Sequence, residues 1–343
     1  LSPVHETSLL PTENLISLQE LSEAALLHAL RLRFKQDQIY TWISTILISV
    51  NPFKHLPIYT KQIMYQHYEL AKRFELSSPH VYATAAQSYV KLCQFKTEPG
   101  MTPKKVSILI GGESGSGKSL STLLCMHFFS EMSNFQQNKN NSSTTATATT
   151  HSLPSSPKNH PSHENTLTSN ILNEDGDEQS DTESNENLDS SSKAITQKIL
   201  SMTPILEAFA NATTVRNNNS SRFGKYIHLY FTPTTFTLTG AAIESYLLEK
   251  SRIVSQSDNE RNYHIFYQLF AGLTEEQRSL YQLGDISTYG IIRGLPRLRD
   301  ASNDAAGDIS KEITGLDDGY DFHRTVTALQ HIGLTSTEIE SIW

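Results

Sequence analysis

The sequence predicts an α/β fold, with helices and strands layered around a hydrophobic core. Hydrophobic residues make up 37% of the 343 residues, which is enough to form such a core. Short apolar runs rich in β-branched residues alternate with longer segments whose apolar residues recur at helical spacing. A polar stretch at residues 134–192 divides these elements into two globular regions, 1–133 and 193–343.

In the first region, Ser17 and Glu20 match a capping box, and apolar residues follow at helical spacing. Asn51 and Pro52 end an apolar run that is typical of a strand. Another such run lies directly before a glycine-rich loop and is typical of a buried strand. The predicted strands are 43–50 and 106–110, and helices are predicted after the capping box and at 61–74, 80–95 and 120–131.

In the second region, Ile227, Leu229 and Phe231 lie at alternate positions, which predicts a strand with these side chains on one face. A Thr-Pro-Thr-Thr turn then leads into a return strand. The predicted strands are 226–231, 236–239 and 247–255, and the predicted helices are 194–211 and 260–273.

The net charge of −8 is concentrated in one stretch. Residues 136–192 contain nine acidic and two basic residues, so this stretch alone carries −7. It is dominated by Ser, Thr and Asn. Because it cannot bury enough apolar surface to offset the loss of chain entropy, we expect residues 134–192 to form a disordered, acidic surface loop.

The composition excludes several classes of protein. The longest apolar run has eight residues, whereas a membrane-spanning helix needs about 20, so no transmembrane segment is expected. The chain does not start with a secretory signal pattern. Its two cysteines are too few for a disulfide framework or a cysteine-based zinc site, which indicates a reducing compartment. Because charges outside the acidic stretch nearly balance, we expect no nucleic-acid binding.

The most specific motif is Gly112-Glu-Ser-Gly-Ser-Gly-Lys-Ser119, which fits G-x-x-x-x-G-K-[ST] between a predicted strand and a predicted helix. Glycines allow successive backbone N–H groups to turn toward phosphate oxygens, and the following helix N-terminus favours negative charge. Lys118 is expected to reach the β- and γ-phosphates, and the Ser119 hydroxyl to bind Mg²⁺. The alternative is a glycine-rich turn with a solvated lysine. The motif predicts a nucleotide-phosphate site and leaves the class of enzyme open.

A second polar segment, residues 217–225, places asparagines, serines and Arg222 in close order before a predicted strand. Such groups suit a Mg²⁺-phosphate site, where catalysis depends mostly on positioning and on stabilising charge. The alternative is a surface turn formed by Asn and Ser side chains.

Five segments resemble the myosin family and occur in the family's order. The resemblance covers nearly the whole chain except residues 136–192 and implies a P-loop NTPase fold. In that fold, a central mixed, mostly parallel β-sheet is flanked by helices, as in an incomplete myosin head. The segments are the P-loop (112–119), switch I (217–225), the loop that contacts adenine (51–59), and the strand and helix after switch I (247–254 and 260–267).

The resemblance assigns residues to the nucleotide. Asn51, Pro52 and Tyr59 would border the adenine. The residues that would wrap the phosphates are Gly112, Glu113, Ser114, Gly115, Ser116, Gly117 and Lys118.

It also assigns residues to the metal and the reaction. Ser119 and Ser221 would be the two protein ligands of Mg²⁺, and Asn217 would touch phosphate. Ser220 would sit beside the attacking water and relay its proton, and Arg222 would pair with a glutamate of switch II.

The implied function is an actin-activated ATPase motor with ATP and Mg²⁺ as cofactors, in the cytoplasm on the actin cytoskeleton. The implied partners are actin filaments, and light chains or calmodulin on a neck outside this chain. Residues 1–133 would carry the adenine loop and P-loop, and residues 193–343 switch I, the transducer strands and part of the upper actin-binding lobe. Residues 134–192 would lie at the nucleotide entrance, where they either tune ADP release or form a tolerated insertion.

The chain departs from the family's usual pattern at three points. Ser116 replaces Ala and Ser119 replaces Thr, so we expect altered rates with the site retained. Switch II does not occur, so Arg222 is expected to lack a partner, and the piece to fold poorly and hydrolyse little ATP. Two alternatives stay open: a P-loop NTPase that does not bind actin, and a truncated, non-enzymatic head that acts as a tether.

Overall fold

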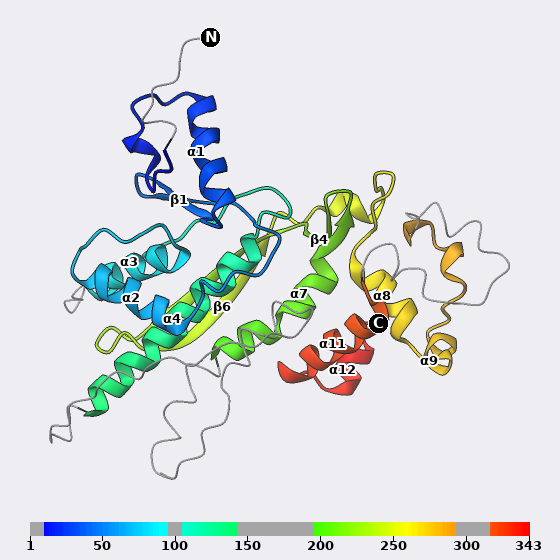
Figure 1. Cartoon of the computed structure of the whole chain (residues 1–343). Coiled ribbons are helices and arrows are strands. Elements are labelled where there is room, and N and C mark those ends of the chain that lie inside the picture. Colours follow the sequence, from blue (N-terminus) through cyan, green and yellow to red (C-terminus); the bar gives the residue numbers. More distant parts are fainter. Residues whose placement is uncertain (1–9, 95–104, 143–194, 293–315) are drawn as a thin grey trace, which may run out of the picture. The chain divides into compact units, whose positions relative to one another are not determined.

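A computed structural model describes residues 10–94, 105–142, 195–292 and 316–343 (Figure 1). Of the stretch predicted to be a disordered loop, 134–192, residues 143–192 lie outside these ranges. The prediction is wrong for residues 134–142, which continue a helix that ends at Ser142. The chain divides into two compact units, which are described separately below. Unit 1 comprises residues 1–108, 128–192 and 232–237, and unit 2 comprises residues 109–127, 193–231 and 238–343.

Unit 1 begins with a 3-10 helix, η2 (Leu15–Ser17), followed by α1 (Glu23–Lys35). The Ser22 hydroxyl caps α1 by accepting a hydrogen bond from the Ala25 amide at 3.3 Å. The capping box predicted at Ser17 is therefore wrong. The cap belongs to the residue whose hydroxyl reaches the unpaired N–H groups of the first helical turn, and Ser17 instead closes η2.

The strand predicted at 43–50 is a β-hairpin. β1 (Tyr40–Ile43) pairs antiparallel with β2 (Ile46–Ser49), and Ser44 in the turn has a φ of 57°. The turn is formed by Ser44 and Thr45, which lack the Gly, Asn or Asp typical of a hairpin turn, so composition alone did not reveal it. The Trp42 indole donates a hydrogen bond to the Ser77 carbonyl at 3.0 Å and anchors the hairpin within unit 1.

Helices α2 (Lys61–Lys72) and α3 (Val81–Cys93) confirm the helices predicted at 61–74 and 80–95. The predicted helix at 120–131 is also confirmed, as the first half of α4 (Lys118–Ser142). From residue 128 onward α4 belongs to unit 1, where Phe128 packs against Tyr82. Both rings are fully buried, so aromatic side chains form much of this core.

Unit 2 contains two antiparallel hairpins. β3 (Asn211–Thr214) pairs with β4 (Asn217–Ser221), and β5 (Gly224–Phe231) pairs with β6 (Leu238–Tyr246). β5 confirms its prediction, and β6 is longer than the return strand predicted at 236–239. Each sheet among the described residues has two strands and is antiparallel. A central, mostly parallel sheet is not among them and stays a prediction.

Two predicted strands are wrong. Residues 106–110 form no strand, and Leu109 is 96% exposed, because an apolar run is buried as a strand only where neighbouring strands pair with it. Residues 247–255 contain the 3-10 helix η3 (Lys250–Ile253). There the Arg252 guanidinium is buried and pairs with Glu249 and Glu260, both at 2.9 Å, which favours a compact turn over an extended strand.

The helix predicted at 194–211 breaks at Met202, before Pro204 in the first turn of α7 (Thr203–Ala210). The helix predicted at 260–273 begins later, at His264, as α8 (His264–Gly272). α7 and α8 contact α11 (Asp318–His331), and this helical group lies next to β3 and β4 (Figure 1). The remaining elements are α9 (Glu275–Leu280), η4 (Ile286–Thr288), η5 (Gly290–Ile292) and α12 (Ser336–Glu340).

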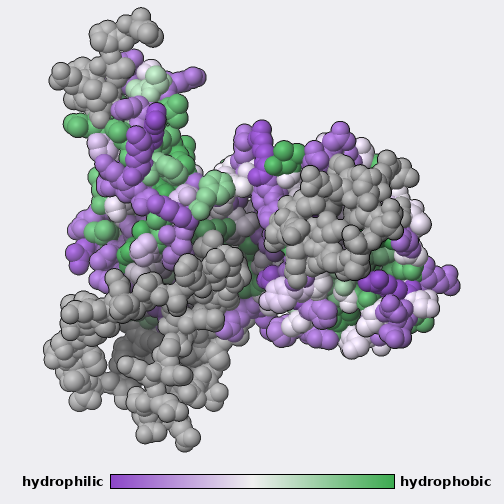
Figure 2. Space-filling model, turned by 45° about the vertical axis from the view of Figure 1, so that its right-hand side comes forward, coloured by the Kyte–Doolittle hydropathy of each residue, from purple (hydrophilic) through white to green (hydrophobic). Residues whose placement is uncertain are grey.

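Polar side chains cover much of the visible surface, with hydrophobic side chains scattered among them (Figure 2). In the N-terminal part of unit 1, Leu27 and Ile46 are both more than half exposed. Within the described ranges, every helix is too short or too polar to cross a membrane.

Candidate functional site

The glycine-rich loop of unit 2 connects an extended segment to α4. Gly115 and Gly117 have φ values of 79° and 91°, which residues other than glycine rarely adopt. Lys118 is the first residue of α4, so the loop ends at a helix N-terminus. This combination of left-handed glycines and a helix N-terminus is the arrangement that binds phosphate.

The Lys118 side chain folds over the loop. Its Nζ donates hydrogen bonds to the carbonyl oxygens of Gly112 and Glu113, both at 2.8 Å. Ser116 lies close to Gly112, since a Cβ built at Gly112 would come within 2.5 Å of the Ser116 Oγ. The loop therefore holds a positive charge beside its backbone N–H groups.

Residues 217–221 form β4, so the prediction of a polar loop at 217–225 is wrong for this part. Asn and Ser have low β-propensity, yet β4 is held by its pairing with β3. Its residue Ser220 is fully buried, and the Ser220 Oγ accepts a hydrogen bond from the Ser114 hydroxyl at 2.7 Å. The structure thus brings together two segments that are 106 residues apart in the sequence.

Arg222 has a partner within this chain, contrary to the prediction. Its Nε donates to the Glu249 carboxylate at 2.5 Å, and its Nη1 donates to the Ser220 Oγ at 3.3 Å. The hydrogen bond from Arg222 lowers the pKa of Glu249, against the opposing effect of partial burial. Because the Ser220 oxygen accepts from both Ser114 and Arg222, its own proton can be donated to a third group.

Ser119 and Ser221, the expected Mg²⁺ ligands, both lie in unit 2 with exposed side chains. Hydroxyl oxygens are hard ligands that suit Mg²⁺, which also keeps waters and substrate phosphates as ligands. The residues present therefore fit a Mg²⁺-phosphate group. No group of three or more His, Cys, Asp or Glu residues that could hold a metal occurs in the described part of the chain.

Glu113 contacts the turn between β3 and β4, and Asn217 contacts a neighbour in its own strand. Glu113 pairs with Arg216 at 2.8 Å, and both side chains are more than 70% exposed, so this pair contributes little stability. The Asn217 side chain holds the backbone of Asn219, accepting from its N–H at 3.0 Å and donating to its carbonyl at 3.2 Å.

The three residues expected at adenine lie in unit 1. Asn51 Oδ1 accepts from the Phe53 amide at 3.0 Å and forms a turn that continues through Pro52. The Tyr59 hydroxyl contacts the Tyr40 hydroxyl at 3.0 Å. Burial raises the pKa of Tyr59, so its phenol stays neutral.

Two contacts were not predicted from the sequence: Glu249 as the partner of Arg222, and His264 as the partner of Asn219 in β4. The spacing of Glu249 and Arg252 could have indicated a pair on one helical turn. The Asn219–His264 contact joins residues 45 positions apart, and no local pattern indicates it.

Comparison with known proteins gives a consistent result. The family model described as the myosin head (motor domain) matches residues 12–343. The chain is 35% identical over 333 residues to the myosin-J heavy chain of Dictyostelium discoideum, covering 96% of this chain and 13% of that protein. It is 36% identical over 324 residues to myosin-2 of Saccharomyces cerevisiae, covering 94% and 16%.

Unconventional myosin-IXa of Mus musculus is 35% identical over 328 residues, covering 94% of this chain and 10% of that protein. The chain therefore spans a small part of the length of the curated relatives it matches. The family implies a P-loop NTPase-type fold, in agreement with the mixture of helices and strands described above. The chain belongs to the myosin head (motor domain) family.

Proposed function

We propose that this chain is the nucleotide-binding part of an ATP-hydrolysing motor head that moves along actin filaments. The observation that carries the proposal is the contact between the P-loop and β4, in which the Ser114 hydroxyl donates to Ser220. It supports a site in which both segments surround one phosphate group. Membership of the myosin head family favours ATP as that nucleotide.

In the proposed site, backbone N–H groups of residues 112–117 and the Lys118 ammonium bind the phosphates. Ser119 and Ser221 hold Mg²⁺, which neutralises charge on the phosphate oxygens. Asn217 contacts phosphate, and Ser220 orients the attacking water with the proton that its two donors leave available. Asn51, Pro52 and Tyr59 border the adenine.

Arg222 stabilises negative charge that develops near Ser220, since its guanidinium already contacts that hydroxyl. Glu249 holds the Arg222 guanidinium in this chain. If Arg222 left Glu249 and paired with another carboxylate during the cycle, its guanidinium would move. The proposal also includes a central, mostly parallel sheet and a contact with actin through residues 193–343. It further includes a neck that binds light chains or calmodulin. It places the protein in the cytoplasm on the actin cytoskeleton.

The test is steady-state Mg²⁺-ATPase activity, with and without actin filaments, of the chain in its complete reading frame. Several-fold activation by actin supports the motor. Turnover without activation favours a P-loop NTPase that does not bind actin, and nucleotide binding without turnover favours a tether.

Lys118→Ala tests the nucleotide site itself. We expect it to weaken the binding of a fluorescent ATP analogue by about tenfold or more, because it removes a charge that contacts phosphate. Arg216→Ala, which removes an exposed charge that pairs with the same loop, is the matched control and should bind normally. Equal affinity in Lys118→Ala and the unchanged protein would contradict the assignment of the loop.

A further inference from the structure

The side-chain oxygen of Asn219 in β4 is held by two donors. This Oδ1 accepts hydrogen bonds from Asn211 Nδ2 at 2.8 Å and from His264 Nε2 at 3.2 Å. Two elements, β3 and α8, therefore meet at one side chain of β4.

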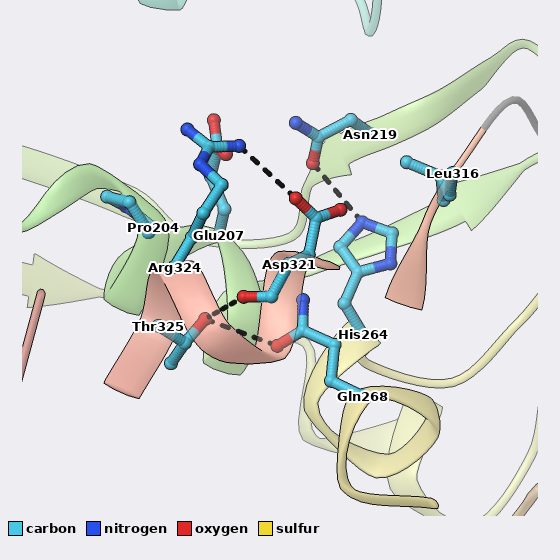
Figure 3. A pocket seen from close by; sticks show the side chains of 9 residues that line it. All are labelled: Pro204, Glu207, Asn219, His264, Gln268, Leu316, Asp321, Arg324 and Thr325. Atoms are coloured by element: carbon cyan, nitrogen blue, oxygen red, sulfur yellow. Dashed lines mark hydrogen bonds and ion pairs between the residues drawn. The ribbon is translucent and has the colours of Figure 1, made fainter. Parts of the chain in front are cut away.

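Asn219, His264 and Glu207 of α7 line a small polar cavity of about 30 Å³ within unit 2, which has room for one or two water molecules (Figure 3). On its other side lie Asp321 and Arg324 of α11, which pair at 3.2 Å. In Figure 3 the side chains of Asn219 and His264 point toward each other from different elements. The cavity is built from ionisable and amide groups, so the position of Asn219 depends on how these groups are paired.

His264 can serve only as a donor to Asn219. Its side chain is 4% exposed, and burial together with the nearby Arg261 lowers its pKa to about 3, so the ring is neutral near pH 7. Because the Asn219 Oδ1 is an acceptor, the ring carries its proton on Nε2. Burial raises the pKa of Glu207, and the nearby Arg324 acts in the opposite direction.

The fixed side chain of Asn219 controls the backbone on both sides of it. On one side, the Asn217 side chain forms hydrogen bonds with the backbone N–H and carbonyl of Asn219. On the other side, the next residue is Ser220, whose buried hydroxyl contacts Ser114 of the P-loop. A shift of Asn219 would therefore move the Ser220 hydroxyl relative to the P-loop.

We propose that His264 is a positioning residue for the hydrolysis step, which it influences by holding Asn219 and so keeping Ser220 against Ser114. The inference rests on the proposed function, because it assigns Ser220 to the reaction. In the described contacts, His264 acts through Asn219, from α8.

The decisive variants are His264→Leu, which removes the donor, and His264→Gln, whose amide nitrogen can replace Nε2. With the protein in its complete reading frame, we expect His264→Leu to lower the single-turnover rate of ATP hydrolysis about tenfold while nucleotide affinity changes less than about threefold, as for a misplaced group. His264→Gln should recover most of the rate.

Thr325→Val is the matched control, because Thr325 lines the same cavity but hydrogen bonds to Gln268 and Asp321. It should hydrolyse ATP at the normal rate. Equal rates in folded His264→Leu and His264→Gln proteins would overturn the proposal. So would a parallel loss of nucleotide affinity and hydrolysis.

Amide hydrogen exchange of residues 217–221 gives a readout that needs no turnover. We expect faster exchange in His264→Leu than in Thr325→Val. Unchanged exchange overturns the positioning role whatever the rates are. Absence of hydrolysis by the unchanged protein would overturn the proposed function, and exchange would then show separately whether His264 holds β4.

Discussion

His80 lies at the N-terminus of α3, where its two ring nitrogens hold different parts of unit 1. Its Nδ1 accepts from the Tyr82 amide at 3.0 Å, so its Nε2 carries the proton and donates to the Ile58 carbonyl at 3.0 Å. Its ring stacks on His67 with centroids 4.9 Å apart. A protonated His80 would lose its acceptor, so the folded state requires the neutral ring.

This arrangement predicts acid sensitivity of unit 1. Burial lowers the pKa of His80 to about 3 and that of His67 to about 4, whereas the unfolded value is 6.5. Below pH 6.5 the unfolded state binds more protons than the folded state, so stability falls as pH falls. Between pH 7 and pH 5 each histidine should cost about 2 kcal/mol in the free energy of unfolding.

Urea denaturation at pH 7 and pH 5, followed by tryptophan fluorescence, measures this loss. The variant His67→Asn should show a smaller difference between the two pH values. His55→Gln, which changes an exposed histidine of unit 1, should behave as the unchanged protein does. An equal loss in all three proteins would show that other groups cause the acid sensitivity.

At the scale of elements, α8 and α11 approach closely at Gly272. A Cβ built on Gly272 would lie 2.2 to 2.5 Å from atoms of Phe322, whose side chain is buried and packs on Trp343. The buried ion pair between Arg261 and Asp318, at 2.7 Å, joins the segment before α8 to the start of α11. The lack of a side chain at Gly272 therefore allows the two helices to approach closely, and the ion pair between Arg261 and Asp318 links them.

Gly272→Ala should destabilise unit 2 by about 1–3 kcal/mol, because Phe322 must move in a packed core. Gly284→Ala is the matched control, since the nearest atom to its added Cβ would be the Thr288 Oγ1 at 3.9 Å. Thermal unfolding of both variants gives the comparison. Equal melting temperatures would show that α11 shifts without cost.

At the scale of the whole molecule, the acidic stretch carries nearly all of the net charge and is expected to be a disordered insertion. Replacing residues 143–194 by a Gly-Ser linker of about 13 residues shortens the connection about fourfold. Loop-closure entropy then predicts a gain in stability of about 1 kcal/mol. Loss of cooperative unfolding in urea would show instead that the stretch is part of the fold.

The same pair of proteins separates the two hypotheses for the function of the stretch. A changed rate of ADP release, measured by displacement of a fluorescent ADP analogue, supports tuning at the nucleotide entrance. An unchanged rate supports a tolerated insertion.

Local patterns were sufficient for the long helices and for the glycine-rich loop before α4. Helical spacing predicted α2, α3 and the start of α4. In an amphipathic helix, the residues of the buried face recur every three or four positions, so a short segment of sequence is enough to detect them. The strands were less predictable. The hairpin at β1 and β2, the strand β4 and the turn at η3 each depend on partners distant in sequence or on a turn that composition does not reveal.

The sequence by itself determined the family, the position of the glycine-rich loop and the location of the excess acidic residues. These depend on residue types at fixed spacing along one segment of chain. Only the tertiary structure decided that Ser114 meets Ser220, that Glu249 holds Arg222 and that His264 holds Asn219. Side-chain hydrogen bonds act over about 3 Å, and the fold alone brings residues tens of positions apart within that distance.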